Sequence, residues 1–118
     1  MIAGRVHAGD PSRVVLPRVA KTTSALERMR GLLGRRALAE GEGLLIAPCN
    51  AIHTLFMGFP VDVVFLDRES VVIKILRGVA PFRWAMALGA ARVLETRAGE
   101  ADRAGITTGD RLVWREIA

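Results

Sequence analysis

Two apolar runs joined by four polar residues are the feature that most constrains what this chain can fold into. Residues 61–66 and 71–76 are rich in Val, Ile and Leu, and residues 67–70 between them read Asp-Arg-Glu-Ser. Runs of this length and composition are typical of strands, and a short polar connection between two such runs is typical of a β-hairpin. Asp62 stands inside the first run, where strand alternation places it on the opposite face from Val61 and Val63.

Further short strand-like runs extend this pattern over most of the chain. They lie at residues 13–16, 18–21, 43–47, 51–56, 92–96 and 111–114, and Pro17 interrupts the first pair. Residues 77–91 contain Gly78, Pro81 and Gly89 and are predicted to form a long loop. Many short strands with frequent turn signals predict a mainly β fold. We expect a compact β-sandwich, a jelly-roll-like fold or a partly closed barrel.

Two short helices are predicted beside the strands. Ser24 precedes Glu27 by three residues, the spacing of a capping box, and starts a predicted helix at about residues 24–32. A second short helix is predicted at about residues 99–104. Gly105 and Ile106 follow it in the arrangement of a C-terminal capping motif.

Length and composition favour one small domain that spans residues 1–118. The chain has 118 residues, of which 51% are hydrophobic and 25% are charged, an ordinary globular balance. The single cysteine, Cys49, allows no internal disulfide. The N-terminus carries no apolar run of signal-peptide length, and no run is long enough to span a bilayer. We therefore expect a cytoplasmic protein with no membrane partner.

The net charge of +5 raises the question of a nucleic-acid partner. Of the 17 basic residues, only Lys21 and Lys74 are not arginine, which is typical of a GC-rich coding bias. The basic residues are scattered along the sequence, and no aromatic residues alternate with them. This distribution argues against nucleic-acid binding.

Several segments resemble the family called domain of unknown function 192. They are residues 30–35 (Arg-Gly-Leu-Leu-Gly-Arg), 43–46, 53–67, 93–95, 98–99 and 105–110 (Gly-Ile-Thr-Thr-Gly-Asp). Together they define a family-like core at about residues 24–113. The resemblance implies a compact β-sandwich-like or jelly-roll-like domain and implies no catalytic activity. Many relatives have Trp-Met-Lys-Asn-Thr where this chain has His53-Thr54-Leu55-Phe56-Met57, so a site built on that Lys or Asn does not carry over.

His53 and Asp62 are the first candidates for a site. Both lie near a predicted strand end, on either side of the break at residues 58–60, and an imidazole beside a carboxylate can act as a general base. The alternatives are structural: a histidine bonded to a backbone carbonyl, and an aspartate that pairs with Arg30 or accepts amides of the Gly58 loop. Thr54 and Met57 complete the candidate site.

These residues leave more than one function open. The first hypothesis is a non-enzymatic accessory module that binds a small molecule or a short peptide near His53, Thr54, Met57, Asp62 and Arg30. The alternative is a small hydrolase or isomerase that uses His53 and Asp62, so whether the protein is an enzyme stays open. No metal-ligand spacing or cofactor fingerprint occurs, and no metal or cofactor is expected. A nucleophilic Cys49 would need a base such as His53.

Overall fold

The computed structural model describes residues 1–9, 12–30, 37–54 and 58–117, and it gives no account of the side chains of Met29 and Arg30. The secondary structure within these residues is mainly β, with two short helices, which confirms the predicted class. The strands are β1 (Ile2–Ala8), β2 (Arg13–Lys21), β3 (Glu42–Ile46), β4 (Ala51–His53), β5 (Val61–Leu66), β6 (Val72–Val79), β7 (Trp84–Met86), β8 (Arg92–Arg97) and β9 (Leu112–Glu116). The helices are α1 (Ala25–Arg30) and α2 (Glu100–Arg103).

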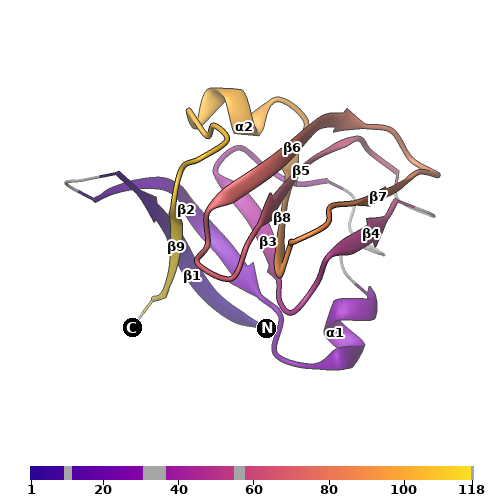
Figure 1. Cartoon of the computed structure of the whole chain (residues 1–118), viewed down its shortest axis with the longest axis horizontal. Coiled ribbons are helices and arrows are strands. Elements are labelled where there is room, and N and C mark those ends of the chain that lie inside the picture. Colours follow the sequence, from indigo (N-terminus) through magenta and orange to yellow (C-terminus); the bar gives the residue numbers. More distant parts are fainter. Residues whose placement is uncertain (10–11, 31–36, 55–57, 118) are drawn as a thin grey trace.

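Seven strands form one mixed sheet in the order β6-β5-β8-β3-β2-β1-β9. β2 and β3 are parallel, and the other neighbours are antiparallel. The two ends of the sheet approach each other at an isolated bridge between Val71 and Arg111, where the N–H of Val72 donates to the carbonyl of Asp110 at 2.8 Å. The sheet is therefore strongly curled but not closed into a barrel (Figure 1).

The curled sheet has an apolar core on each face. The inner core lies inside the curl and joins strands from both ends of the sheet with α2 through Leu16, Leu45, Leu94, Ala101 and Leu112. The outer core lies on the other face, where the two-stranded sheet of β4 and β7 covers the main sheet. Ile52 and Ala85 pack there against residues such as Val63 and Phe65. Every residue of β5 is buried because β5 contributes to both cores.

The predicted hairpin is confirmed as the antiparallel pair β5 and β6. Asp67 closes the turn, since its Oδ1 accepts the N–H groups of Glu69 and Val71 at 2.9 and 3.0 Å. Alternation along β5 is also as predicted. Val63 and Phe65 belong to the outer core and Val64 to the inner core, so Asp62 faces the inner side.

The two predicted helices lie where the capping signals place them. In α1, Ser24 Oγ accepts the N–H of Glu27 at 3.2 Å, while Glu27 Oε1 accepts the N–H of Thr23 at 2.7 Å. The predicted end of this helix, beyond residue 30, lies outside the described residues. After α2, the N–H groups of Gly105 and Ile106 donate to the carbonyls of Asp102 and Ala101 at 3.1 and 2.8 Å, which is the predicted capping motif.

Three local expectations about the strands are wrong or incomplete. Pro17 does not divide two strands; β2 continues through it, and the pairing register with β1 shifts there, between Gly4 and Val6. Residues 77–91 are not one long loop, because β6 continues to Val79 and Trp84–Met86 form β7. β1 had no predicted counterpart. In each case pairing with a distant strand supplies the hydrogen bonds that the local sequence does not announce.

Candidate functional site

Asp62 on β5 forms hydrogen bonds with two other elements, β6 and α2. Its side chain is fully buried, and Oδ1 accepts the N–H of Gly78 at 2.8 Å. Oδ2 accepts the N–H groups of Gly99 and Ala101 at 3.1 and 3.0 Å. The donors therefore come from β6 and from the start of α2, not from the Gly58 loop. A buried carboxylate needs donors of this kind, and here they tie α2 and β6 to β5.

Thr54 is also fully buried, and it fixes the connection that leads to β7. Its hydroxyl donates to the carbonyl of Ala80 at 2.7 Å and accepts the N–H of Arg83 at 2.8 Å. Its backbone N–H donates to the carbonyl of Arg83, and its carbonyl accepts the N–H of Phe82. The side chain and the backbone of Thr54 thus both form hydrogen bonds with the segment that precedes β7.

His53 lies beside Thr54 and faces a large exposed side chain. It pairs with Trp84 across β4 and β7, and the two ring centroids are 5.4 Å apart. Its Nδ1 is buried and has no hydrogen-bond partner among the described residues. Within those residues no hydrogen bond joins His53 to Asp62, whose carboxylate is bound by the three amides. Met57 and the side chain of Arg30 lie outside the described part of the chain.

Glu95 on β8 is a buried carboxyl group that the sequence analysis did not single out. It is only 3% exposed, lies opposite Leu44 and Val63 in the sheet, and faces the outer core. Its Oε2 has no hydrogen-bond partner among the described residues, and burial raises its pKa to about 7. The sequence does carry a signal for it: Glu95 is two residues after Val93 in a predicted strand, so both side chains share one face, and that face is apolar.

Cys49 lies in the connection between β3 and β4 and its thiol donates to the carbonyl of Ala51 at 3.1 Å. Burial raises the pKa of the thiol most, and the charge of Glu95 raises it further. A backbone hydrogen bond with Ala51 and the charge of Arg28 lower it, and the net shift is upward. A thiol that stays protonated is a poor nucleophile.

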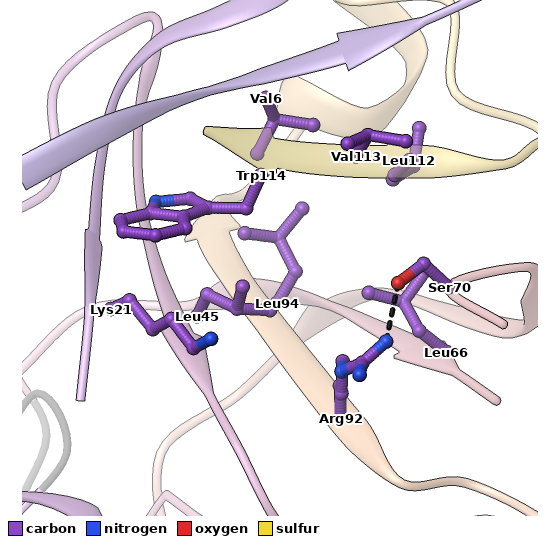
Figure 2. Close-up of a pocket in the computed structure, with 10 residues that line it drawn as sticks. All are labelled: Val6, Lys21, Leu45, Leu66, Ser70, Arg92, Leu94, Leu112, Val113 and Trp114. Carbon is purple, nitrogen blue, oxygen red and sulfur yellow. Dashed lines mark hydrogen bonds between the residues drawn. The ribbon is translucent and has the colours of Figure 1, made fainter. Parts of the chain in front are cut away.

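A pocket of about 160 Å³ opens into the inner side of the curled sheet (Figure 2). It lies between β9 and the strands β3, β5 and β8. Its lining is mostly apolar and consists of Val6, Leu45, Leu66, Leu94, Leu112, Val113 and Trp114 together with Lys21, Ser70 and Arg92. The pocket therefore belongs to the inner core, on the opposite face of the sheet from β4 and His53.

Two cations give this pocket its chemical character. The ammonium group of Lys21 lies 5.2 Å from the ring centroid of Trp114. The guanidinium group of Arg92 donates to Ser70 Oγ and to the carbonyl of Arg68. Among the described residues that line the pocket none is acidic, so both cations retain unused donors beside an apolar wall. Lys21 and Arg92 lie on different strands far apart in sequence, and no local motif points to the pair.

The described residues also bear on metal binding and on membrane insertion. Within them, no group of three His, Cys, Asp or Glu side chains lies close enough together to hold a metal ion. No helix in the described ranges has the length and apolar character needed to cross a membrane.

Comparisons with known proteins agree with this fold. A crystal structure of a protein of unknown function from Novosphingobium aromaticivorans DSM 12444 matches with a TM-score of 0.77 and 27% identity, over 93% of this chain and 84% of that one. A candidate transcription regulator from Sinorhizobium meliloti 1021 matches with a TM-score of 0.82 and 25% identity, over 95% of this chain and 93% of that one. No curated protein matches the chain.

The family comparison covers the strands that build the pocket and the hairpin. The model of the family DUF192, described as "Uncharacterized ACR", matches residues 6–114. This stretch includes His53, Asp62 and Glu95, and it also includes every residue that lines the inner pocket. The chain therefore belongs to the DUF192 family of uncharacterised proteins.

Proposed function

We propose that the protein is a non-enzymatic binding module whose inner pocket takes a small carboxylate with an apolar tail. One observation carries the proposal: Lys21 and Arg92 bring two cations, and no acid, to a pocket lined by leucine, valine and tryptophan side chains. A few convergent polar groups in an apolar cavity are the usual pattern of a ligand site. The charged donors select an anion, and the apolar wall selects its tail.

The volume limits the size of the ligand. At about 30 Å³ for each water molecule, 160 Å³ holds roughly five waters. Most sites for drug-sized molecules are several times larger. A short-chain acid, or the terminal carboxylate of a peptide with its last apolar side chain, is the size that this pocket accepts.

Nuclear magnetic resonance provides a direct test, because the chain has two tryptophans in different regions. The indole N–H of Trp114 donates to the carbonyl of Val19 at the pocket, whereas Trp84 is 72% exposed beside His53. Titration with butyrate should shift the Trp114 indole signal and leave that of Trp84 unchanged. Butyramide is the matched neutral ligand and should bind at least tenfold more weakly, since charge-assisted hydrogen bonds contribute about 1.5 kcal/mol or more.

Two variants locate the binding groups. Lys21→Gln and Arg92→Gln should each weaken butyrate binding by about tenfold, and Arg92→Lys should restore part of it. Arg115→Gln removes the same charge outside the pocket and should change little. Equal binding of butyrate and butyramide, or equal loss in Arg115→Gln, would contradict the proposal.

The region around His53 has features that favour a second binding surface. Large apolar side chains are exposed on β7 and beside it: Phe82 (62%), Trp84 (72%), Met86 (55%) and Leu88 (90%). In the described structure β7 pairs with β4 alone. On its other edge the carbonyl of Met86 accepts Lys74 Nζ at 3.0 Å, and no strand pairs there, so an added strand that displaces the flexible lysine has an edge to join. The unpartnered Nδ1 of His53 lies next to this surface. These features support a short apolar peptide as the ligand of the sequence-predicted site.

Selection from a random heptapeptide library tests this second candidate. The selected peptides should be apolar at alternate positions and should bind the wild-type protein. Trp84→Ser and His53→Ala should each weaken binding by about tenfold or more, as expected for the centre of a small interface. Val14→Ser is the control, because Val14 is 48% exposed on a different strand, β2. Peptides that keep their affinity for Trp84→Ser would exclude this surface.

A further inference from the structure

The curled sheet gathers arginines that are far apart in the sequence into one open groove. The groove has a volume of about 460 Å³ and lies where the β1–β2 turn meets the start of β9. Arg13, Arg111 and Arg115 line it together with His7. Its residues do not line the inner pocket, apart from Val113, so the groove is a separate surface.

Strand alternation explains why the basic side chains on β1 and at the start and end of β9 point the same way. Val6 and Trp114 face each other on the inner side, so Arg5, which lies opposite Arg115, and His7, which lies opposite Val113, share the outer face of β1 and β9. Arg111 has the same parity as Arg115 and precedes β9. The outer face of this end of the sheet therefore carries a row of basic side chains.

The charge of this groove is poorly balanced by acids. In the described structure, Arg5, Arg13, Arg111 and Arg115 form none of the ion pairs observed. Asp110 is the one acidic residue among the lining residues described, and its Oδ2 accepts the N–H of Thr107 at 2.8 Å. By contrast, Arg97 and Arg103 near α2 are paired with Glu40 and Glu100. The groove therefore carries several positive charges that none of these ion pairs neutralises.

We infer that this groove binds the phosphate backbone of a nucleic acid without reading its bases. Single exposed arginines gain little from a small anion in water, because high dielectric and salt weaken each pair. A chain of phosphates gains from several arginines at once through release of its counterions. Arginine forks fit phosphate oxygens in bidentate fashion. Among the described residues the lining contains no Phe, Tyr or Trp ring, and its one aromatic ring is the imidazole of His7. Without a platform of several aromatic rings for successive bases, we expect contact mainly with the backbone.

Fluorescence anisotropy of a labelled 12-nucleotide single strand and of the matching duplex tests the inference. Three phosphate contacts predict that affinity falls about 20- to 40-fold between about 50 and about 200 mM salt. Two probes of unrelated sequence should bind equally. In Arg111→Gln/Arg115→Gln, binding should weaken at low salt and the slope of affinity against salt should shrink by about two charges.

The matched control is Arg68→Gln/Arg83→Gln, which removes the same charge at two exposed arginines outside the groove. This control should retain the wild-type affinity and slope. Equal losses of affinity in both double variants would show that net charge alone attracts the probe, and would contradict the assignment of binding to the groove. Absence of binding at low salt would overturn it as well. A labelled poly-glutamate chain of the same charge is a further probe. If it binds as tightly as the oligonucleotide, the ligand is an acidic protein segment and the nucleic-acid inference is wrong.

Discussion

Asp62 and Glu95 are two buried carboxyl groups on neighbouring strands, and they face opposite sides of the sheet. Asp62 faces the inner core and accepts three backbone N–H groups from β6 and from the start of α2. Glu95 faces the outer core, and its Oε2 has no hydrogen-bond partner in the described structure. Both are at most 3% exposed. Burial alone therefore does not decide what a carboxyl group does.

The difference lies in the surroundings of each side chain. The segments next to Asp62 are irregular backbone, Gly78 with φ 61° and Gly99 with φ 90°, which point free N–H groups at the carboxylate. The neighbours of Glu95 are regular strands whose N–H groups already bond within the sheet. A carboxylate that faces free N–H groups holds the segments that carry them in place. A carboxyl group that faces only strands whose N–H groups are already bonded has no such donors, and burial raises its pKa.

Removing the Asp62 carboxylate should have the largest effect on stability. Asp62→Ala removes the acceptor of three backbone N–H groups, in one buried and two part-buried hydrogen bonds, and should lower the free energy of unfolding by about 3–5 kcal/mol. Urea unfolding followed by circular dichroism measures the change. Asp67→Ala is the control: its carboxylate also accepts two backbone amides, but in a less buried turn, and we expect a loss of about 1 kcal/mol. Similar losses in the two variants would refute the structural role given to Asp62.

The contrasting prediction for Glu95 concerns pH. Its pKa is about 7 in the folded protein against a usual value of 4.5, so the folded state binds an extra proton between these values. The free energy of unfolding should therefore fall by about 3 kcal/mol as pH rises from about 4.5 to about 7, with the full loss present above pH 7. In Glu95→Gln this component should vanish, and the variant should be more stable than the wild type at pH 8.

Urea midpoints measured from pH 4 to pH 8 for both proteins isolate this component. Glu116→Gln, at an exposed position of β9, should keep the wild-type profile. If the difference between Glu95→Gln and the wild type does not change with pH, then Glu95 has a partner that keeps it charged. The comparison with Asp62 would then fail.

The parts of the fold that the sequence predicts are those with local causes. The hairpin of β5 and β6 follows from two apolar runs and an Asp-containing turn, and the end of α2 follows from Gly105 and Ile106. The inward direction of Asp62 follows from alternation in the same way. The donors of Asp62 do not follow, because Gly78 and Gly99 reach it only through tertiary structure.

The remaining features depend on contacts between distant segments. β7 is three residues long in a segment interrupted by glycine and proline, and its pairing with β4 decides its conformation. The pocket joins Lys21 of β2 to Arg92 of β8, and the basic groove joins Arg13 to Arg111. Charges that are scattered in the sequence acquire a common face only after the sheet curls. No periodicity within one segment contains that information.

The smallest expected effect separates the backbone around Asp62 from the carboxylate itself. Gly99 has φ 90°, and a Cβ added there would meet no atom within 4 Å. Gly99→Ala should therefore cost only the strain of a left-handed residue, about 1–2 kcal/mol, while Gly58→Ala, which has neither a positive φ nor a contact, should be near neutral. In an Asp62→Ala background, urea unfolding should give the same cost for Gly99→Ala if strain is its whole cause. A smaller cost there would show that the substitution also displaces the Gly99 N–H from Asp62, so that the two groups act as one unit.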